Sequence, residues 1–401
     1  MDIRPKKLRR TVYTMMTYDF DRVIDRRGTN AVKCDGTPEG VLPYWIADME
    51  FATVPEVTDA LIERAKHPIY GYTDEGEEYF EALRQWFDTR FGWKVEKDWM
   101  ILTPGVVPAI FAAVRALTEE GDAVLIQQPV YFPFPNAITT NGRRMVDSPL
   151  VFADGKYRID FDDFERKIVE NDVKLFIMCS PHNPVGRVWT VEELERVGEI
   201  CLRHGVKVVS DEIHMDFVYP GHKHTVFASL RPEFADISVI CTAPSKTFNL
   251  AGLQDSNIFV PNPELRERMK AVMGQLSMGG VNLMGLAACQ AAYAHGAEWV
   301  RQLNAYLYDT VCFMREFIET RIPKVRMIEP EGTYLMWLDF RALGLDEKGL
   351  EELTLRRARV QFNPGAMFGP GGEGFERWNI ACPRAMVEEG LLRLEEAINA
   401  L

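Results

Sequence analysis

Short runs of apolar residues alternate with longer amphipathic stretches from about residue 100 onward. Runs at 123–129, 173–181, 206–212, 237–243 and 256–261 have the length and the β-branched content of strands. Between them, stretches such as TVEELERVGEICLRHG (190–205) repeat apolar residues at helical spacing. Strands that alternate with helices require crossover connections, so the pattern predicts an α/β fold with a mostly parallel central sheet and flanking helices.

The pattern changes after Asn282. A long helical stretch at 286–321 is followed by a strand-like segment, TYLMWLDF, a further helix and a glycine-rich turn, FGPGGEGF. The length of 401 residues exceeds that of one ordinary domain. We therefore expect a large domain at 51–285 and a smaller α+β domain at 286–401. The first 50 residues are expected to pack on the smaller domain.

Composition and charge exclude several classes of partner. Hydrophobic residues make up 47% and charged residues 26% of the chain, as in a folded soluble protein. The net charge of −13 disfavours nucleic acid and anionic membranes. Neither a membrane-spanning run nor a secretory signal at the start is evident, and the seven cysteines are scattered without a C-x-x-C pair. These features predict a cytoplasmic protein with reduced thiols.

Polar residues follow three of the predicted strands. Asn183 comes after 173–179, Asp211 ends the strand that follows, and Ser245 and Lys246 come after 237–243. In open parallel sheets, ligands bind at the carboxyl ends of the strands. An amide, a carboxylate and an amine are thus expected at one edge. Pyridoxal phosphate requires such a set, because it needs a lysine for its Schiff base and an acid beside its pyridinium nitrogen.

Other residues could complete such a cofactor site. Backbone N–H groups of Gly105, Val106 and Val107 at a predicted helix N-terminus would favour a phosphate group. Tyr131 follows another strand, where its ring could stack on the pyridine, and His214 could reach the same region. Each residue alone also has an ordinary interpretation: Lys246 as a solvated lysine, Asp211 as a helix N-cap, Asn183 as a turn former, the tyrosines as packing residues and His214 as a core histidine.

The motifs SPHNPVGRVW, SDEIHMDF, APSKTFNLAG and RWNIACPR, in this order, resemble those of fold-type I, aspartate aminotransferase-like pyridoxal phosphate enzymes. With YWIADMEF and IYGYT, the chain is most similar to the MalY/PatB group of carbon–sulfur lyases, which includes cystalysin and cystathionine β-lyases. The resemblance covers nearly the whole chain. It implies an aspartate aminotransferase-like fold with pyridoxal 5'-phosphate as the cofactor.

The resemblance also implies roles for individual residues. Lys246 would be the Schiff-base lysine, Asp211 the partner of the ring nitrogen, Asn183 the donor to the phenolic oxygen and Tyr131 the stacking ring. Ser245 would contact the phosphate, and Arg377 and Ala47 would contact the substrate. Tyr72 of IYGYT would reach the cofactor of a neighbouring subunit, which implies a homodimer with shared active sites.

The implied activity is β-elimination from an S-substituted cysteine, which releases thiol, pyruvate and ammonia. The alternative is a class I/II aminotransferase. Aminotransferases of this kind commonly carry an arginine eight positions after the lysine, but this chain has Gln254 there, which favours the lyase. A third hypothesis is a regulatory protein that retains the cofactor. The histidines of GHKH, His222 and His224, are expected to form an exposed loop rather than a metal site.

Overall fold

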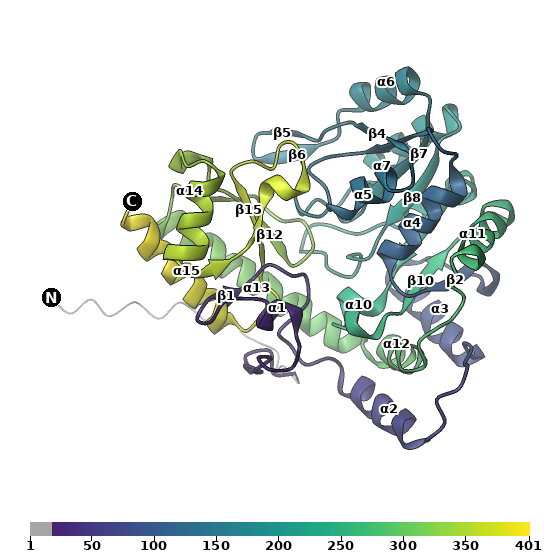
Figure 1. Cartoon of the computed structure of the whole chain (residues 1–401), viewed down its shortest axis with the longest axis horizontal. Coiled ribbons are helices and arrows are strands. Elements are labelled where there is room, and N and C mark those ends of the chain that lie inside the picture. Colours follow the sequence, from purple (N-terminus) through teal and green to yellow (C-terminus); the bar gives the residue numbers. More distant parts are fainter. Residues whose placement is uncertain (1–17) are drawn as a thin grey trace.

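The computed structural model describes residues 18–401, so the expectation about a secretory signal lies largely outside the described residues. A seven-stranded sheet forms the larger part of the fold (Figure 1). Its strands, in spatial order, are β2 (Met100–Thr103), β10 (Ser256–Phe259), β9 (Ser238–Thr242), β8 (Lys207–Asp211), β7 (Val173–Cys179), β3 (Ala123–Ile126) and β4 (Arg144–Asp147). Six strands run in the same direction, and β10 runs opposite to them. The prediction of a mostly parallel sheet is confirmed.

Helices cover both faces of this sheet. On β7, Leu175 and Ile177 enter one hydrophobic core, whereas Phe176 and Met178 enter another. This two-sided burial explains why the strands are continuously apolar. The first core is completed by α4 (Val106–Leu117), α5 (Pro133–Thr139) and α11 (Pro263–Gln275). The second includes residues of α2 (Pro55–Lys66), α3 (Glu77–Phe91), α6 (Phe161–Asn171), α7 (Val191–Arg203), α8 (Phe227–Leu230), α9 (Pro232–Asp236) and α12 (Leu283–His295).

The predicted helix at 190–205 illustrates how local sequence defines an element. Thr190 caps α7: its hydroxyl accepts from the backbone N–H of Glu193 at 3.2 Å, and the Glu193 carboxylate accepts from the N–H of Thr190 at 2.9 Å. This reciprocal pair satisfies two N–H groups that the first turn leaves without partners. The helix therefore begins where the sequence pattern indicates.

A second sheet lies in the C-terminal part of the chain. Its antiparallel strands are, in order, β11 (Arg326–Met327), β12 (Leu335–Asp339), β15 (Phe375–Asn379) and β14 (Asn363–Pro364). It is accompanied by α13 (Ala297–Arg321), α14 (Glu347–Glu351) and α15 (Arg384–Asn399). Near the N-terminus, α1 (Val32–Asp35) precedes β1 (Leu42–Pro43), which pairs in parallel with β13 (Val360–Gln361). The domain boundaries at 50 and 285 stay predictions. A hairpin, β5 (Val151–Ala153) and β6 (Lys156–Arg158), lies outside both sheets.

The long helical stretch at 286–321 falls into two helices rather than one. The helix α12 ends at His295 and α13 begins at Ala297, with Gly296 between them. A Cβ atom at Gly296 would lie 2.2 Å from Cε1 of Phe248, so the close approach of this ring requires glycine. None of the helices formed by the described residues is long and apolar enough to cross a membrane.

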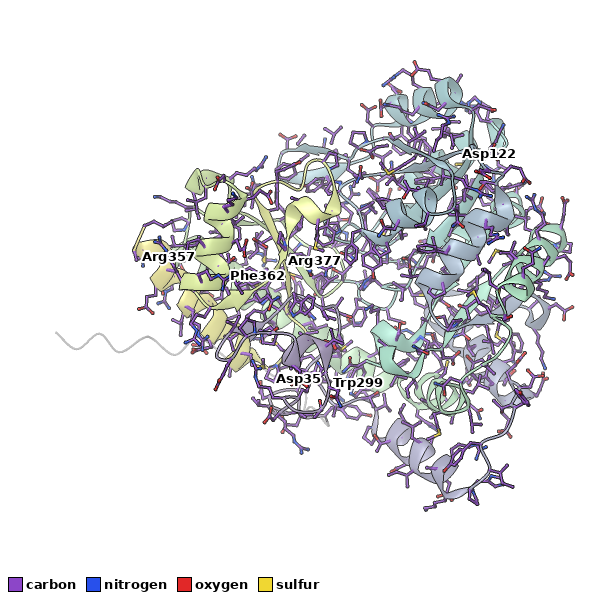
Figure 2. All side chains as sticks on the ribbon, viewed as in Figure 1. Asp35, Asp122, Trp299, Arg357, Phe362 and Arg377 are labelled. Carbon is purple, nitrogen blue, oxygen red and sulfur yellow. The ribbon has the colours of Figure 1, made fainter. Side chains whose placement is uncertain are left out.

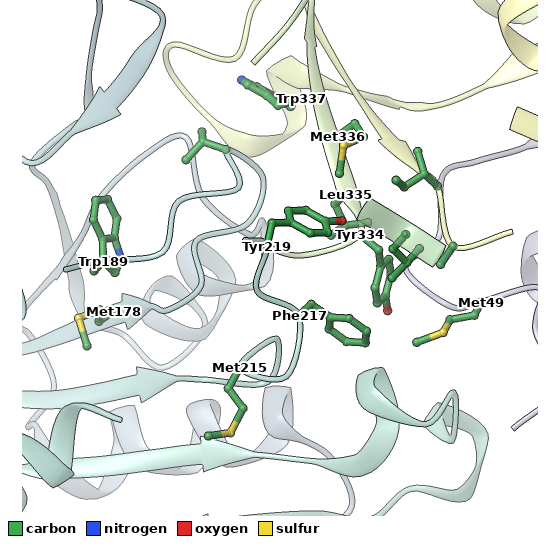
Figure 3. Close-up of a cluster of buried hydrophobic side chains, with 14 of the residues drawn as sticks. Met49, Met178, Trp189, Met215, Phe217, Tyr219, Tyr334, Leu335, Met336 and Trp337 are labelled. Carbon is green, nitrogen blue, oxygen red and sulfur yellow. The ribbon is translucent and has the colours of Figure 1, made fainter. Parts of the chain in front are cut away.

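Aromatic side chains pack where the C-terminal sheet meets the large sheet. Tyr334, just before β12, contacts Phe217 edge to face, with ring centroids 4.8 Å apart. Figure 3 shows these two rings beside Met49, which comes from the N-terminal part of the chain. Segments distant in sequence thus share one buried cluster, and this cluster fixes their positions around the carboxyl end of β8.

Candidate active site

A cavity of about 190 Å³ lies at the carboxyl ends of β7 and β8. Ten of the twelve residues proposed from the sequence line it: Ala47, Gly105, Val106, Val107, Tyr131, Asn183, Asp211, His214, Ser245 and Lys246. The side chain of Arg377 approaches from the C-terminal sheet and bonds to one of them. Tyr72 lies elsewhere. The convergence of the strand ends, which the topology requires, therefore brings the expected side chains together.

Lys246 lies in α10 (Pro244–Thr247), the short helical turn after β9. Its half-buried side chain points to the N-terminal segment, where Nζ donates to the carbonyl oxygen of Ala47 at 2.6 Å. Burial, followed by the positive charge of Arg377, lowers the pKa of Lys246 to about 8. The amine can therefore be neutral, and so act as a base or a nucleophile, close to physiological pH.

Asp211 is the last residue of β8, so the helix N-cap interpretation of it is wrong. Its side chain is 3% exposed, and Oδ1 accepts from the backbone N–H of Ile213 at 3.2 Å. Burial raises the pKa of Asp211 to about 7, against the lowering effects of this hydrogen bond and of Lys246. No cation among residues 18–401 forms an ion pair with the carboxylate. It is therefore suited to a positively charged group of a ligand.

Arg377 on β15 links the two sheets. Nη1 donates to Oδ1 of Asn183 at 3.0 Å, and Nη2 donates to the carbonyl of Trp45 at 3.0 Å and to Oδ1 of Asn363 at 2.5 Å. All these acceptors are neutral, and no carboxylate in the described part of the chain pairs with the guanidinium. Burial lowers the pKa of Arg377 to about 10. Figure 2 labels Arg377 on the C-terminal sheet.

The surroundings of Arg377 favour an anion. Its Nε–H is buried and, within residues 18–401, has no hydrogen-bond partner. A buried cation without a counter-ion is costly, and the carboxylate of a ligand would offset this cost. The ring of Phe368 lies 4.8 Å below the guanidinium carbon and fixes its plane.

The N-terminus of α4 borders another part of the cavity. Gly105 is the N-cap and has extended backbone, and the first helical residues are Val106 and Val107, as predicted. Such a helix end carries free N–H groups that attract an anion. Ser256, at the start of β10, also lines the cavity, and its buried hydroxyl has no partner among the described residues. Gln254 lies in the same wall.

Tyr131 and His214 line the same cavity. Burial raises the pKa of Tyr131 and keeps its phenol protonated. The ring of His214 packs edge to face on Tyr334, with centroids 5.7 Å apart, and burial lowers its pKa well below the usual range. Its Nδ1 is buried and lacks a partner within the described part of the chain. His214 is thus a neutral ring whose buried Nδ1 is available to a ligand.

Tyr72 and the two GHKH histidines are placed differently from the cavity residues. Tyr72 is fully exposed in the segment between α2 and α3 and does not line this chain's cavity. His222 is exposed as expected, but the expectation was wrong for His224. His224 is buried, with Nε2 2.7 Å from Oε2 of Glu212. The carboxylate of Glu212 supplies the polar partner that makes this burial possible.

Three residues near the cavity were not among the candidates from the sequence. Asp255 and Ser256 line the wall, and Tyr334 donates to the carbonyl of Ala47 at 3.1 Å. Ser256 begins an antiparallel strand, whose amino end faces the same edge as the carboxyl ends of its neighbours. A rule that searches only carboxyl ends therefore misses it.

Residues 46–394 match the family of class I and II aminotransferases. The chain belongs to this family, whose members depend on pyridoxal phosphate. It is 46% identical to cystathionine beta-lyase PatB of Bacillus subtilis, over 95% of this chain and 100% of that protein. It is 33% identical to protein MalY of Escherichia coli, over 96% and 100% of the two chains. Cystalysin from Treponema denticola, whose crystal structure contains pyridoxal 5'-phosphate, superimposes with a TM-score of 0.93 at 39% identity, covering 96% and 100%.

The donor set of the cavity fits this cofactor. The unpaired carboxylate of Asp211 suits a protonated ring nitrogen, and the amine of Lys246 suits an aldehyde. The orphan hydroxyl of Ser256 and the N-terminus of α4 suit a phosphate group. Within residues 18–401 the Asp211 carboxylate has no ion-pair partner and the Ser256 hydroxyl has no hydrogen-bond partner. Together the groups match the ring nitrogen, the aldehyde and the phosphate of pyridoxal phosphate.

Proposed function

We propose that the protein is a pyridoxal phosphate-dependent carbon–sulfur β-lyase that cleaves an S-substituted cysteine to a thiol, pyruvate and ammonia. The observation that carries the proposal is the cavity in which Lys246, Asp211 and the Asn183–Arg377 pair converge. Relatives named cystathionine beta-lyase, and a neighbouring structure named C-S lyase, support the choice of reaction.

Each residue has a role that follows from its surroundings. Lys246 would hold the cofactor covalently, Asp211 its ring nitrogen, Asn183 its phenolic oxygen and Tyr131 its ring face. Ser245, Ser256 and the N-terminus of α4 would hold its phosphate, and His214 would pack near the ring. When bound, pyridoxal phosphate withdraws electrons from Cα of an amino acid and weakens the Cα–H bond.

Arg377 and Lys246 divide the work on the substrate. Arg377 binds the α-carboxylate, because this is the anion that its buried guanidinium lacks. The free amine of Lys246 would take the Cα proton on Nζ, since a pKa of about 8 leaves part of it neutral near physiological pH. The carbonyl of Ala47 accepts a hydrogen bond from this amine and so orients it before proton transfer. Loss of the Cα proton allows the thiolate to leave from Cβ.

The test is production of pyruvate without a keto-acid acceptor. Purified protein with pyridoxal phosphate is incubated with L-cystathionine, L-cysteine and a panel of S-substituted cysteines, and thiol and pyruvate are measured. We expect equal amounts of thiol and pyruvate, and loss of both in Lys246→Ala. Absence of pyruvate from every substrate would refute the proposal.

Transamination is the second candidate, because the matching family is that of aminotransferases. The same incubations with and without 2-oxoglutarate separate the two reactions. A lyase needs no acceptor, whereas an aminotransferase turns over only when a keto acid regenerates the cofactor. The place of Gln254 in the cavity wall, where this class commonly has arginine, favours the lyase.

We also propose a homodimer with shared active sites. Ile69, Tyr70 and Tyr72 expose large apolar surfaces on the segment between α2 and α3. Such a cluster is suited to burial against a second copy, and Tyr72 would there contribute its hydroxyl to the partner's cofactor phosphate. Light scattering should give about twice the chain mass of 45.8 kDa. Tyr72→Phe should weaken cofactor binding without changing this mass.

A cytoplasmic location is proposed on the state of the cysteines. All seven are free thiols, and six are buried. Free thiols are the usual state in a reducing compartment. Fractionation of cells that produce the protein should recover it with cytoplasmic markers, and recovery with an oxidising compartment would contradict the proposal.

A further inference from the structure

The segment Trp45–Met49, called the strap below, borders the cavity at Ala47, beside Lys246. Each of its five carbonyl groups accepts a hydrogen bond from a side chain outside the strap. The carbonyl of Trp45 accepts from Arg377 at 3.0 Å, and that of Ile46 from Asn379 at 2.6 Å. The carbonyl of Ala47 accepts from Lys246 at 2.6 Å and Tyr334 at 3.1 Å, and that of Asp48 from Lys33 at 3.1 Å and Asn379 at 2.6 Å. The carbonyl of Met49 accepts from Asn249 at 3.0 Å and Arg26 at 3.2 Å. The strap is therefore held along its whole length by groups from the C-terminal sheet, from α10 and the turn after it, and from the N-terminal residues.

Lys33 is the unusual member of this set. It is 1% exposed, although lysine is rarely fully buried unless it is paired. Its Nζ lies 2.8 Å from Oε1 of Glu50 and 3.4 Å from Oδ1 of Asp48, and it also donates to the backbone carbonyl of Asp48. Arg26 pairs with the same two carboxylates. The cluster thus contains two cations and two anions and is balanced in charge.

The cluster around Lys33 and the amine of Lys246 contact adjacent carbonyl groups of the strap. The carbonyl that Lys33 holds belongs to Asp48, and the preceding carbonyl, that of Ala47, accepts from Lys246. The two carbonyls belong to adjacent peptide units that meet at Cα of Asp48, so only the two backbone dihedrals of Asp48 separate the carbonyl that Lys33 holds from the acceptor of the Lys246 amine.

We propose that Lys33 is a positioning residue for the reaction: its buried ammonium fixes the strap so that the carbonyl of Ala47 holds the amine of Lys246 in place for proton transfer. The inference rests on the proposed function for the identity of the reaction. The contact between the strap and the amine of Lys246 is independent of which reaction the protein catalyses.

A charge effect accompanies the geometric one. Lys33 is surrounded by five charged or titratable groups: Arg26 and Cys34 from the N-terminal segment, Asp48 from the strap, Glu50 just after it, and Cys382 after β15. Lys246 is surrounded by Arg377, Asp48, Asp211, His214 and Lys33 itself. Among these, Lys33 lowers the pKa of Lys246, and Asp48 raises it. Removal of the ammonium would leave the cluster with a net negative charge and favour the protonated amine.

The first experiment measures the pKa of Lys246 directly. The full-length chain is freed of cofactor and labelled with an acylating reagent at a series of pH values, and labelling of the Lys246 peptide is followed by mass spectrometry. In the wild type, we expect a midpoint near 8. Lys33→Met should raise it by roughly half a unit or more, whereas Lys33→Arg should not. The double variant Lys33→Met/Glu50→Gln loses one charge of each sign and should return the midpoint toward the wild-type value. An unchanged midpoint in Lys33→Met overturns the charge effect.

The second experiment measures proton transfer in the holoenzyme. With a Cα-deuterated substrate, Lys33→Met and the double variant should show kcat at least about tenfold lower, a larger primary isotope effect and a KM within about twofold of the wild type. A loss of overall stability alone would not change the isotope effect. Lys174→Met, which breaks an exposed pair with Asp172, is the matched control and should match the wild type.

The two proposals fail in different ways. If Lys33→Met does not fold, the double variant, in which the carboxylate is removed as well, still decides the geometric role through kcat and the isotope effect. Wild-type values for both quantities in the double variant would overturn the role of Lys33. If the wild type forms no pyruvate but the Lys246 midpoint still responds to Lys33→Met, the reaction has been misassigned while the link between the strap and the amine stands.

Discussion

Asp211→Asn should stabilise the cofactor-free protein at alkaline pH, and by an amount that depends on pH. Burial raises the pKa of the Asp211 carboxyl from 3.8 to about 7. Between these values the folded chain keeps a proton that the unfolded chain loses, so the stability of the wild type falls as pH rises through this window. At one pKa unit per 1.36 kcal/mol, the full cost above pH 7 is about 4 kcal/mol. Asparagine does not titrate and avoids this cost.

The pH dependence separates this effect from other consequences of the substitution. A new amide with an unsatisfied donor would cost about 1–3 kcal/mol, but equally at every pH. Between pH 5 and pH 8, the wild type should lose about 2.5 kcal/mol that the variant does not lose. With an unfolding entropy of about 2.1 cal/mol/K per residue, this corresponds to a gain of about 3 °C in the Tm difference, variant minus wild type.

The assay is differential scanning calorimetry of cofactor-free protein at pH 5 and pH 8. Asp154→Asn, at an exposed turn residue, serves as the control and should give the same Tm difference at both pH values. With the cofactor bound, the sign should reverse, because the carboxylate would then be stabilised by the ring nitrogen. A Tm difference for Asp211→Asn that is independent of pH would show that the carboxyl is already ionised at pH 5.

Three further outcomes are expected. Arg377→Lys cannot reproduce the planar two-pronged contact, so the KM for S-substituted cysteines should rise roughly 10- to 100-fold in steady-state assays; an unchanged KM would mean that the carboxylate binds elsewhere. Tyr334→Phe removes one donor to Ala47, and kcat should fall roughly three- to tenfold, whereas equal kcat values would show that Lys246 needs no such support. Burial, with smaller effects of Glu347 and Glu351, raises the pKa of Glu376 to about 8, so the wild type loses stability as pH rises from about 4.5 to 8. Glu376→Gln should therefore raise Tm at pH 9 relative to the wild type more than at pH 5, and equal effects at both pH values would contradict the raised pKa.

The sequence was sufficient to predict the part of the site that the sheet itself builds. Asn183, Asp211 and Lys246 follow strands of one sheet, and the geometry of parallel strands brings their side chains to a common edge. The helix N-terminus at Gly105 could be recognised for the same reason. Local pattern and fold class are enough to place these residues.

The remaining contacts depend on long-range packing that no local pattern encodes. Ala47 and Arg377 were identified only by family resemblance, because they reach the cavity from the N-terminal segment and the C-terminal sheet. Lys33 has the usual signature of a solvated residue, and only the fold shows that it is buried between carboxylates. The burial of His224 likewise depends on Glu212 in a different segment.

Gly296, between α12 and α13, restricts which substitutions the protein can tolerate near its reactive lysine. Gly296 touches the ring of Phe248, which lies two residues beyond Lys246. Any larger residue at the helix junction would push this ring and strain the turn that carries the reactive lysine. Substitution of Gly296, which contacts no ligand, would then lower catalytic activity. A smaller residue at position 248 should restore this activity.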